Sequence, residues 1–204
     1  MSRIVAALTL WLCLLGAGPA SARVLGDATV AYSAERVLTV NGQSFAGRIY
    51  AIPGHQRHEQ SVAGIQQVAI FDLAAGRGYF ILPALMSYVD FRIAGVLAEL
   101  SMPDITGSPA GTETVSGIVT AKYKVLKRAA DGTRLEGMIW LSASGIPMRA
   151  NGTVIDGNGA RTHFSWEFSN VHVGPQDAAM FAAPEGFYRL PAAALPGFLG
   201  GPGG

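Results

Sequence analysis

The sequence carries little charge and almost no cysteine. Of its 204 residues only 14% are charged, and 15 lysines and arginines nearly balance 14 aspartates and glutamates. Such a balance leaves no basic stripe, so we expect no nucleic-acid partner. One cysteine excludes a scaffold stapled by disulfides, and a hydrophobic content of 50% excludes a disordered chain. The length instead suits a single domain with its own hydrophobic core.

The first 22 residues have the pattern of a secretory signal peptide. Arg3 supplies the positive charge, residues 4–15 form a mostly apolar run, and Ala-Ser-Ala at 20–22 has the form of a cleavage site. The apolar run falls short of the roughly 20 residues that span a bilayer. We therefore expect cleavage after Ala22, a periplasmic location and no membrane span in the mature chain. Cys13 lies in the apolar run, so the mature chain is expected to lack cysteine.

Most of the remaining sequence alternates between short β-forming runs and turn signals. Asn41-Gly42, between the runs 29–40 and 45–52, is the strongest of these signals, because both residues of a tight hairpin turn need positive φ. A stretch of Gly, Ser, Pro and Thr at 106–112 is predicted to be a loop. Further strands are predicted at 55–62, 65–73, 79–82, 87–93, 114–119, 121–128, 135–141, 146–152 and 161–173.

Helix is scarce in this pattern. Residues 94–102 are the best helix candidate, ended by Pro103, and residues 177–181 suit one helical turn. About ten strands joined by short turns are typical of an antiparallel meander and not of βαβ units.

The longest predicted strand, 161–173, has one apolar face. Phe164, Trp166 and Phe168 share that face, while polar residues such as Glu167 occupy the other. One short helix is too small to cover such a face across about ten strands. The sheet is therefore expected to curl on itself, to pack as a sandwich or to hold a hydrophobic ligand.

A series of short motifs extends over most of the chain. It comprises GRIY, RHE, VAIFD, GYFILP and SYVDF between residues 47 and 91, followed by GTETVSG, KYKV, LEGMIWLSASGIP and MFAAPEGFY. In this order the motifs resemble a family of exported bacterial domains similar to the periplasmic lipoprotein carrier LolA and its outer-membrane receptor LolB. The resemblance covers residues 27–190.

The resemblance implies a mainly β fold. We expect a strongly curved antiparallel sheet, an unclosed half-barrel of about ten strands, with one or two short helices over its concave face. Relatives hold acyl chains in that apolar cavity. The carrier has a longer helical lid than this sequence offers, and its lid-locking arginine matches no particular arginine here. We expect a signal peptide at 1–22, one LolA-like β domain at 23–194 and a flexible Gly/Pro-rich tail at 195–204.

Aromatic side chains are the best candidates for lining such a cavity. Ordinary core packing is the alternative, since cavities and cores use the same residue types and differ only in volume. The predicted lining residues are Phe91, Trp140, Phe164, Trp166 and Phe168.

Three charged residues are candidates for the rim of the cavity. Arg57 and Glu59 lie two apart and share a strand face, and Asp72 in the next predicted strand is placed to pair with Arg57. They are predicted to contact a lipid head group or a protein partner. The alternative is a surface charge ladder that contributes only tenths of a kcal/mol.

The sequence has no recognisable catalytic or metal-binding set. His55 and His58 belong to HQRHE, which is not HExxH, and they are predicted to point to opposite faces of a strand. There is no GxSxG elbow for a serine nucleophile. We expect no metal, no cofactor and no catalytic residue, with a convergent hydrolase site as a minor alternative.

The predicted function is therefore binding or carriage of a hydrophobic ligand, a lipid or acyl chain, in an apolar half-barrel cavity. The alternative is a non-catalytic β-module that binds an envelope protein and has no ligand cavity.

Overall fold

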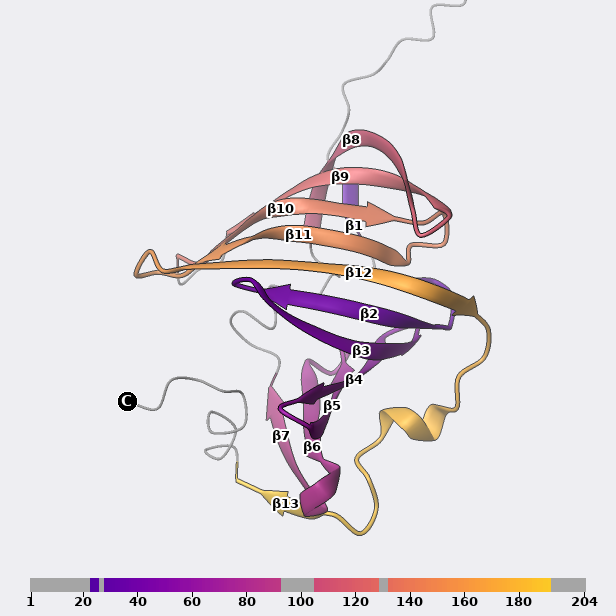
Figure 1. Cartoon of the computed structure of the whole chain (residues 1–204), viewed down its shortest axis with the longest axis vertical. Coiled ribbons are helices and arrows are strands. Elements are labelled where there is room, and N and C mark those ends of the chain that lie inside the picture. The colour runs from indigo at the N-terminus through magenta and orange to yellow at the C-terminus, as the bar shows by residue number, and fades with distance from the viewer. Residues whose placement is uncertain (1–22, 26–27, 93–104, 129–131, 192–204) are drawn as a thin grey trace, which may run out of the picture.

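The described strands of the chain form one sheet (Figure 1). The computed structural model describes residues 23–25, 28–92, 105–128 and 132–191. Within them a 13-stranded sheet has the order β1-β8-β9-β10-β11-β12-β2-β3-β4-β5-β6-β7-β13. The strands are β1 (Arg23–Leu25), β2 (Tyr32–Val40), β3 (Gln43–Ile52), β4 (His55–Val62), β5 (Ile65–Asp72), β6 (Arg77–Leu82), β7 (Ser87–Arg92), β8 (Ile105–Val115), β9 (Ile118–Arg128), β10 (Arg134–Leu141), β11 (Pro147–Ile155), β12 (Arg161–Val173) and β13 (Tyr188–Leu190).

The sheet curves strongly and does not close into a barrel. Its two ends are β1 and β13, and β12 lies beside β2, which joins the early strands to the late ones. In Figure 1 β8 to β12 cross the upper part of the view, and β5 to β7 are turned steeply against them. The predicted unclosed half-barrel is confirmed, with 13 strands instead of about ten. β13 departs from the antiparallel pattern, because it pairs with β7 in parallel.

The hairpin predicted at Asn41-Gly42 is confirmed. The two residues have φ values of 47° and 84°, and they join β2 to β3. Asn41 also accepts a hydrogen bond on Oδ1 from the backbone N–H of His163, at 2.8 Å. The turn thereby holds the adjoining strand β12 as well as its own hairpin.

The loop predicted over 106–112 is wrong, because β8 runs through it. A bulge between Pro109 and Thr112 shifts the register against β9. The bulge accommodates a proline, which has no N–H to donate to a regular ladder. The turn to β9 comes later, at Ser116-Gly117, where φ values of 48° and 80° suit a tight hairpin.

Two 3₁₀ turns complete the described elements, η1 (Pro83–Leu85) and η3 (Ala178–Phe181). The helical turn predicted at 177–181 is confirmed as η3, and Asp177 caps it by accepting a hydrogen bond from the N–H of Ala179. The helix candidate at 94–102, the signal peptide at 1–22 and the tail at 195–204 lie outside the described residues.

Side chains along the strands alternate between two faces. We call the first face the one that carries Phe164 and Trp166 of β12, and the second face the one that carries Ser165 and Glu167. Residues directly opposite each other in neighbouring strands point to the same face, so the register extends this assignment across the sheet.

The core consists of three clusters. One cluster surrounds Ile139 on the first face of β9 to β12. A second cluster contains Tyr32 and Met148. The third lies on the second face of β5 and β6, where Phe181 of η3 packs against Ile70 and its neighbours. The connection from β12 to β13, the yellow segment of Figure 1, therefore covers part of the second face.

Candidate functional site

Acidic side chains of the described strands all point to the second face. Glu35 lies opposite Ser169, and Glu59 lies opposite Arg48, both on that face. The acidic residues that the register places there are Glu35, Glu59, Asp72, Asp90, Glu113, Glu136 and Glu167. The first face of these strands is left without negative charge, and this face is the candidate site.

Aromatic rings of the first face lie over glycines. Phe91 Cζ lies 2.7 Å from the position that a Cβ would take at Gly78, and Phe164 Cζ lies 3.1 Å from that position at Gly152. Each glycine is directly opposite its phenylalanine in the neighbouring strand. Phe164 also stacks on Trp166, with ring centroids 5.7 Å apart. The three aromatic side chains are half-buried, so the rings form a partly open apolar surface.

Phe71 belongs to this surface and escaped the sequence prediction. It lies on the first face of β5, and its ring meets that of Phe91 edge to face at 5.9 Å. The apolar run 68–71 resembles a wholly buried strand, and only the register shows which of its residues face the aromatic surface.

The other two predicted lining residues lie elsewhere. Phe168 shares the first face, but it is 2% exposed and belongs to the core cluster of Tyr32. Trp140 is 4% exposed and lies on the second face, opposite Arg149 and Lys122. The five predicted residues therefore do not form one surface, and the lining role of Phe91, Phe164 and Trp166 stays a prediction.

Trp140 anchors a charged cluster on the second face. Its Nε1 donates a hydrogen bond to Glu113 Oε2 at 2.8 Å, and Lys122 Nζ lies 4.8 Å from the ring centroid. Arg149 donates to Glu113 at 2.7 Å and to Glu167 at 2.9 Å. The hydrogen bond from Trp140, assisted by Arg149, holds the pKa of Glu113 below its ordinary value. This cluster ties β8 to β12 across the sheet.

The predicted rim residues also lie on the second face. Arg57 and Glu59 form an ion pair at 2.7 Å, and Arg57 donates to the Met180 carbonyl at 3.0 Å. The predicted pairing of Arg57 with Asp72 is wrong, because Arg57 lies opposite Ile70. Asp72 instead pairs with Arg77 at 3.4 Å, beyond the turn that it caps. A rim role for the three residues stays a prediction.

A polar cluster that sequence reasoning missed lies on the first face. Arg36 of β2 reaches over β3 to β4, where Nη1 contacts Nδ1 of His58 and Nη2 donates to Gln60 Oε1 at 2.9 Å. His58 Nε2 contacts Gln56 Oε1 at 3.1 Å. A guanidinium only donates, so Nδ1 of His58 must accept and Nε2 must carry the proton that Gln56 accepts.

Burial changes the titration of both charged members of this cluster. Arg36 is 9% exposed, and desolvation lowers its pKa to about 10, so it remains a cation at neutral pH. Burial, reinforced by the Arg36 charge, lowers the pKa of His58 well below its ordinary value. The cluster therefore holds one positive charge among neutral acceptors.

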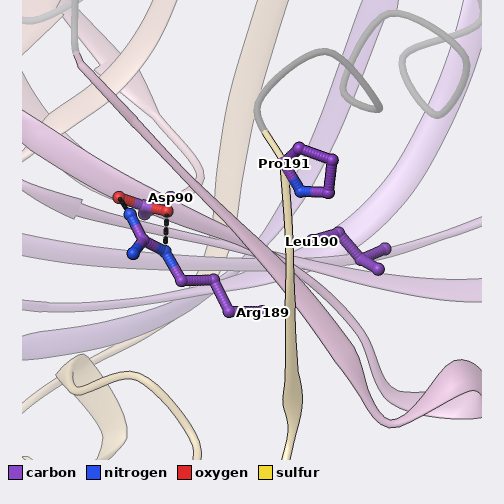
Figure 2. A pocket seen from close by; sticks show the side chains of 4 residues that line it. All are labelled: Asp90, Arg189, Leu190 and Pro191. Carbon is purple, nitrogen blue, oxygen red and sulfur yellow. Dashed lines mark hydrogen bonds and ion pairs between the residues drawn. The ribbon is translucent and has the colours of Figure 1, made fainter.

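A pocket of about 300 Å³ lies at the β13 edge and is separate from the aromatic surface. Arg189 of β13 donates two hydrogen bonds to the carboxylate of Asp90 in β7, at 2.6 Å and 2.7 Å, as Figure 2 shows. These bonds lower the pKa of Asp90 and raise that of Arg189. Leu190 and Pro191 complete the lining. The ion pair is exposed, and its evident effect is to fasten the parallel strand β13 to β7.

The described part of the chain contains no group of three or more His, Cys, Asp or Glu side chains placed to hold a metal ion. None of its helices is long and apolar enough to cross a membrane.

Comparison with solved structures identifies the fold. An uncharacterized conserved protein from Thermus thermophilus matches with a TM-score of 0.52 and 14% identity, over 80% of this chain and 91% of that one. MucB matches with a TM-score of 0.51 and 14% identity, over 81% of this chain and 61% of MucB. A LolA superfamily protein from Nitrosomonas europaea matches with a TM-score of 0.43 and 6% identity, over 78% and 93% of the two chains.

The likeness is one of fold. This chain shares its fold with the Thermus thermophilus protein and with MucB, the two matches with TM-scores above 0.5. No protein-family model matches the sequence, and no curated protein matches it.

Proposed function

We propose that the protein binds a hydrophobic ligand, a lipid or an acyl chain, on the first face of its sheet. The observation that carries this proposal is the absence of acidic side chains from the first face, because the acidic side chains of the described strands all lie on the opposite face. An uncharged chain transferred from water to the first face gains about 0.8 kcal/mol for each buried CH₂ group.

The half-buried aromatic rings are the proposed contact surface. Phe164 and Trp166 stack on β12, and Phe71 and Phe91 meet on β5 and β7. Flat rings over glycines offer a smooth apolar floor, which suits a flexible chain of no fixed shape. We further propose that residues 1–22 direct export to the periplasm and that residues 23–194 act as one binding domain. Binding of this kind needs no cofactor and no catalytic residue.

A charge on this surface is expected to abolish ligand retention. Trp166→Asp places a carboxylate among the rings, where an apolar chain would have to strip it of water. The measurement is native mass spectrometry of the protein purified from its own periplasm, followed by solvent extraction of bound molecules. Wild type is expected to carry lipid at a defined stoichiometry, and folded Trp166→Asp is expected to carry none.

Ser165→Asp is the matched control for this experiment. Residue 165 is the neighbour of Trp166 in β12 but belongs to the second face, so the same charge there is expected to leave the lipid in place. Normal lipid content in a folded Trp166→Asp variant would count against the proposal, as would a bare wild-type protein that stays bare after incubation with envelope lipids.

Binding of an envelope protein is the second candidate function. Leu85 at the end of η1, Met86 just after it and Tyr188 at the start of β13 are large and more than half exposed. They lie close together, since the Tyr188 N–H donates to the Met86 carbonyl. Exposed apolar patches of this kind mark interaction sites. MucB, which resembles this chain in fold, forms a complex with MucA. A protein that is bare in the mass spectrum and captured by one envelope protein through this patch would favour the second candidate.

A further inference from the structure

The positive charge of Arg36 is buried without a carboxylate beside it among the described residues. Its sequence neighbour Glu35 points to the second face, where it lies 3.9 Å from Arg48. Glu59 of β4 also points there and pairs with Arg57. Taking an arginine out of water without an opposite charge is unfavourable by several kcal/mol. A buried positive charge without a carboxylate partner therefore suggests a binding site for a ligand.

The guanidinium keeps donors to spare. Nη1 and Nη2 are engaged by His58 and Gln60, and Nε is buried with no hydrogen-bond partner. Arginine binds carboxylates and phosphates through two parallel N–H groups, and Nε with one Nη forms such a pair. The neutral acceptors hold the side chain in place and leave its charge uncompensated.

Gly47 leaves the surface of β3 beside Arg36 free of a side chain. It lies directly opposite Arg36 in β2 and Gln60 in β4, so the guanidinium passes over a residue without a side chain. A Cβ at Gly47 would lie 2.1 Å from the Glu59 carbonyl oxygen, which no adjustment of a side chain can relieve. The backbone therefore reserves this position for glycine.

The Arg36 cluster also adjoins the aromatic surface, through the ring of His58. The His58 ring meets Phe71 edge to face at 5.4 Å, and Phe71 meets Phe91 in the same way at 5.9 Å. On its other side Arg36 lies opposite Phe168 of β12. A molecule that places an anion at Arg36 can lay an apolar chain along the rings of β5 and β7.

We propose that Arg36, held by His58 and Gln60, binds the anionic head group of a lipid, a carboxylate or a phosphate monoester, whose chain lies on the first face. This inference rests on the proposed binding of a hydrophobic ligand. It adds the class of ligand, an acyl chain that ends in an anion, and it names the residue that distinguishes such a ligand from a neutral one.

The test compares ligands that share one chain and differ in the head group. Isothermal titration calorimetry of the wild-type protein with oleate, oleyl phosphate and oleyl alcohol is expected to show at least tenfold tighter binding of an anionic ligand than of the alcohol. The tighter of the two anions identifies the head group. Inorganic phosphate, which has no chain, is expected not to compete.

Variants assign the preference to Arg36. Arg36→Met is expected to bind oleyl alcohol as wild type does and to lose the preference for the anions. Arg48→Met is the matched control, because Arg48 lies on the next strand but is exposed on the second face, and this variant is expected to keep the preference. Thermal unfolding of each variant establishes that it is folded.

The outcomes separate this inference from the function on which it rests. Equal affinity of wild type for oleate, oleyl phosphate and oleyl alcohol overturns the head-group site and leaves hydrophobic binding intact. A preference that survives in folded Arg36→Met overturns the role of Arg36. Competition by inorganic phosphate identifies a free-anion site and overturns the lipid. If none of the three oleyl ligands binds, the proposed function itself fails.

Discussion

Replacement of Phe168 by alanine is expected to lower the free energy of unfolding by about 3–5 kcal/mol, because it deletes an aromatic ring from a closed core. The Phe168 side chain is 2% exposed, and its ring centroid lies 6.3 Å from that of Tyr32. Met148 and Ile49 of the same cluster are also fully buried, so the surrounding chain has little freedom to fill the cavity. Urea unfolding followed by circular dichroism measures the loss.

Phe164→Ala is the control for this prediction. The Phe164 ring lies four residues away in the same strand and on the same face, but it is half-buried. Its removal is expected to lower stability by less than half as much, since the hydrophobic contribution is proportional to the area removed from water. Equal losses for the two variants would show that Phe168 is no more a core residue than Phe164, and that the first face is uniformly open or uniformly closed.

The periodicity of β12 predicts which of its side chains share a face, but it does not predict what lies above them. Phe164 and Phe168 are equivalent by period, and the difference between them comes from Tyr32 of β2 and Met148 of β11, which lie far from Phe168 in sequence. Trp140 shows the same limit. Its face is set by its register with β9 and β11, and an isolated run of apolar residues carries no sign of that register.

Turn chemistry could be predicted where one local rule applies. Asn41-Gly42 satisfies the demand of a tight hairpin for two positive φ angles, and the predicted turn is found. The segment 106–112 has equally good loop composition and forms a strand, because pairing with β1 and β9 and a bulge at Pro109 outweigh local preference. Three-residue β13 is too short for any periodic signal, and it joins β7 through a parallel ladder and the Asp90–Arg189 pair.

The polar cluster is the part of the site that sequence reasoning could least predict. Arg36 and His58 lie 22 residues apart, on strands that are not neighbours, and the strand between them, β3, places Gly47 opposite Arg36. Adjacent in sequence, Glu35 and Arg36 resemble an ion pair, yet strand alternation sends them to opposite faces. The prediction that His55 and His58 point to opposite faces is confirmed. No other feature of the sequence indicated on which face the His58 side chain lies.

The stability of the protein is expected to fall as the pH drops below about 6.5, and His58 is the group responsible. In the unfolded chain His58 takes up a proton near that pH. In the folded protein burial and the Arg36 charge lower its pKa well below that value, so the ring stays neutral. The unfolded state then binds more protons than the folded state, and each pH unit lost over this window removes up to about 1.4 kcal/mol. The loss is absent above pH of about 7.

The groups that face the His58 ring explain why protonation is so unfavourable there. Arg36 donates to Nδ1, Gln56 accepts from Nε2, and Phe71 presents a ring from β5. None of these carries a negative charge, so a second cation in this place would meet the Arg36 charge at hydrogen-bond distance and lose the Nδ1 lone pair that accepts it.

The measurement is the free energy of unfolding in urea at a series of pH values from about 8 to about 5, for wild type and for His58→Gln. Glutamine keeps an acceptor for Arg36 and a donor for Gln56 but cannot take up a proton. The free energy of unfolding of His58→Gln is therefore expected to depend less steeply on pH, by a slope that corresponds to up to one bound proton. His163→Gln is the matched control, because His163 is exposed on β12 and hydrogen-bonded to Thr153. This control is expected to follow wild type, and parallel curves for wild type and His58→Gln would show that His58 titrates as freely in the folded protein as in the unfolded chain.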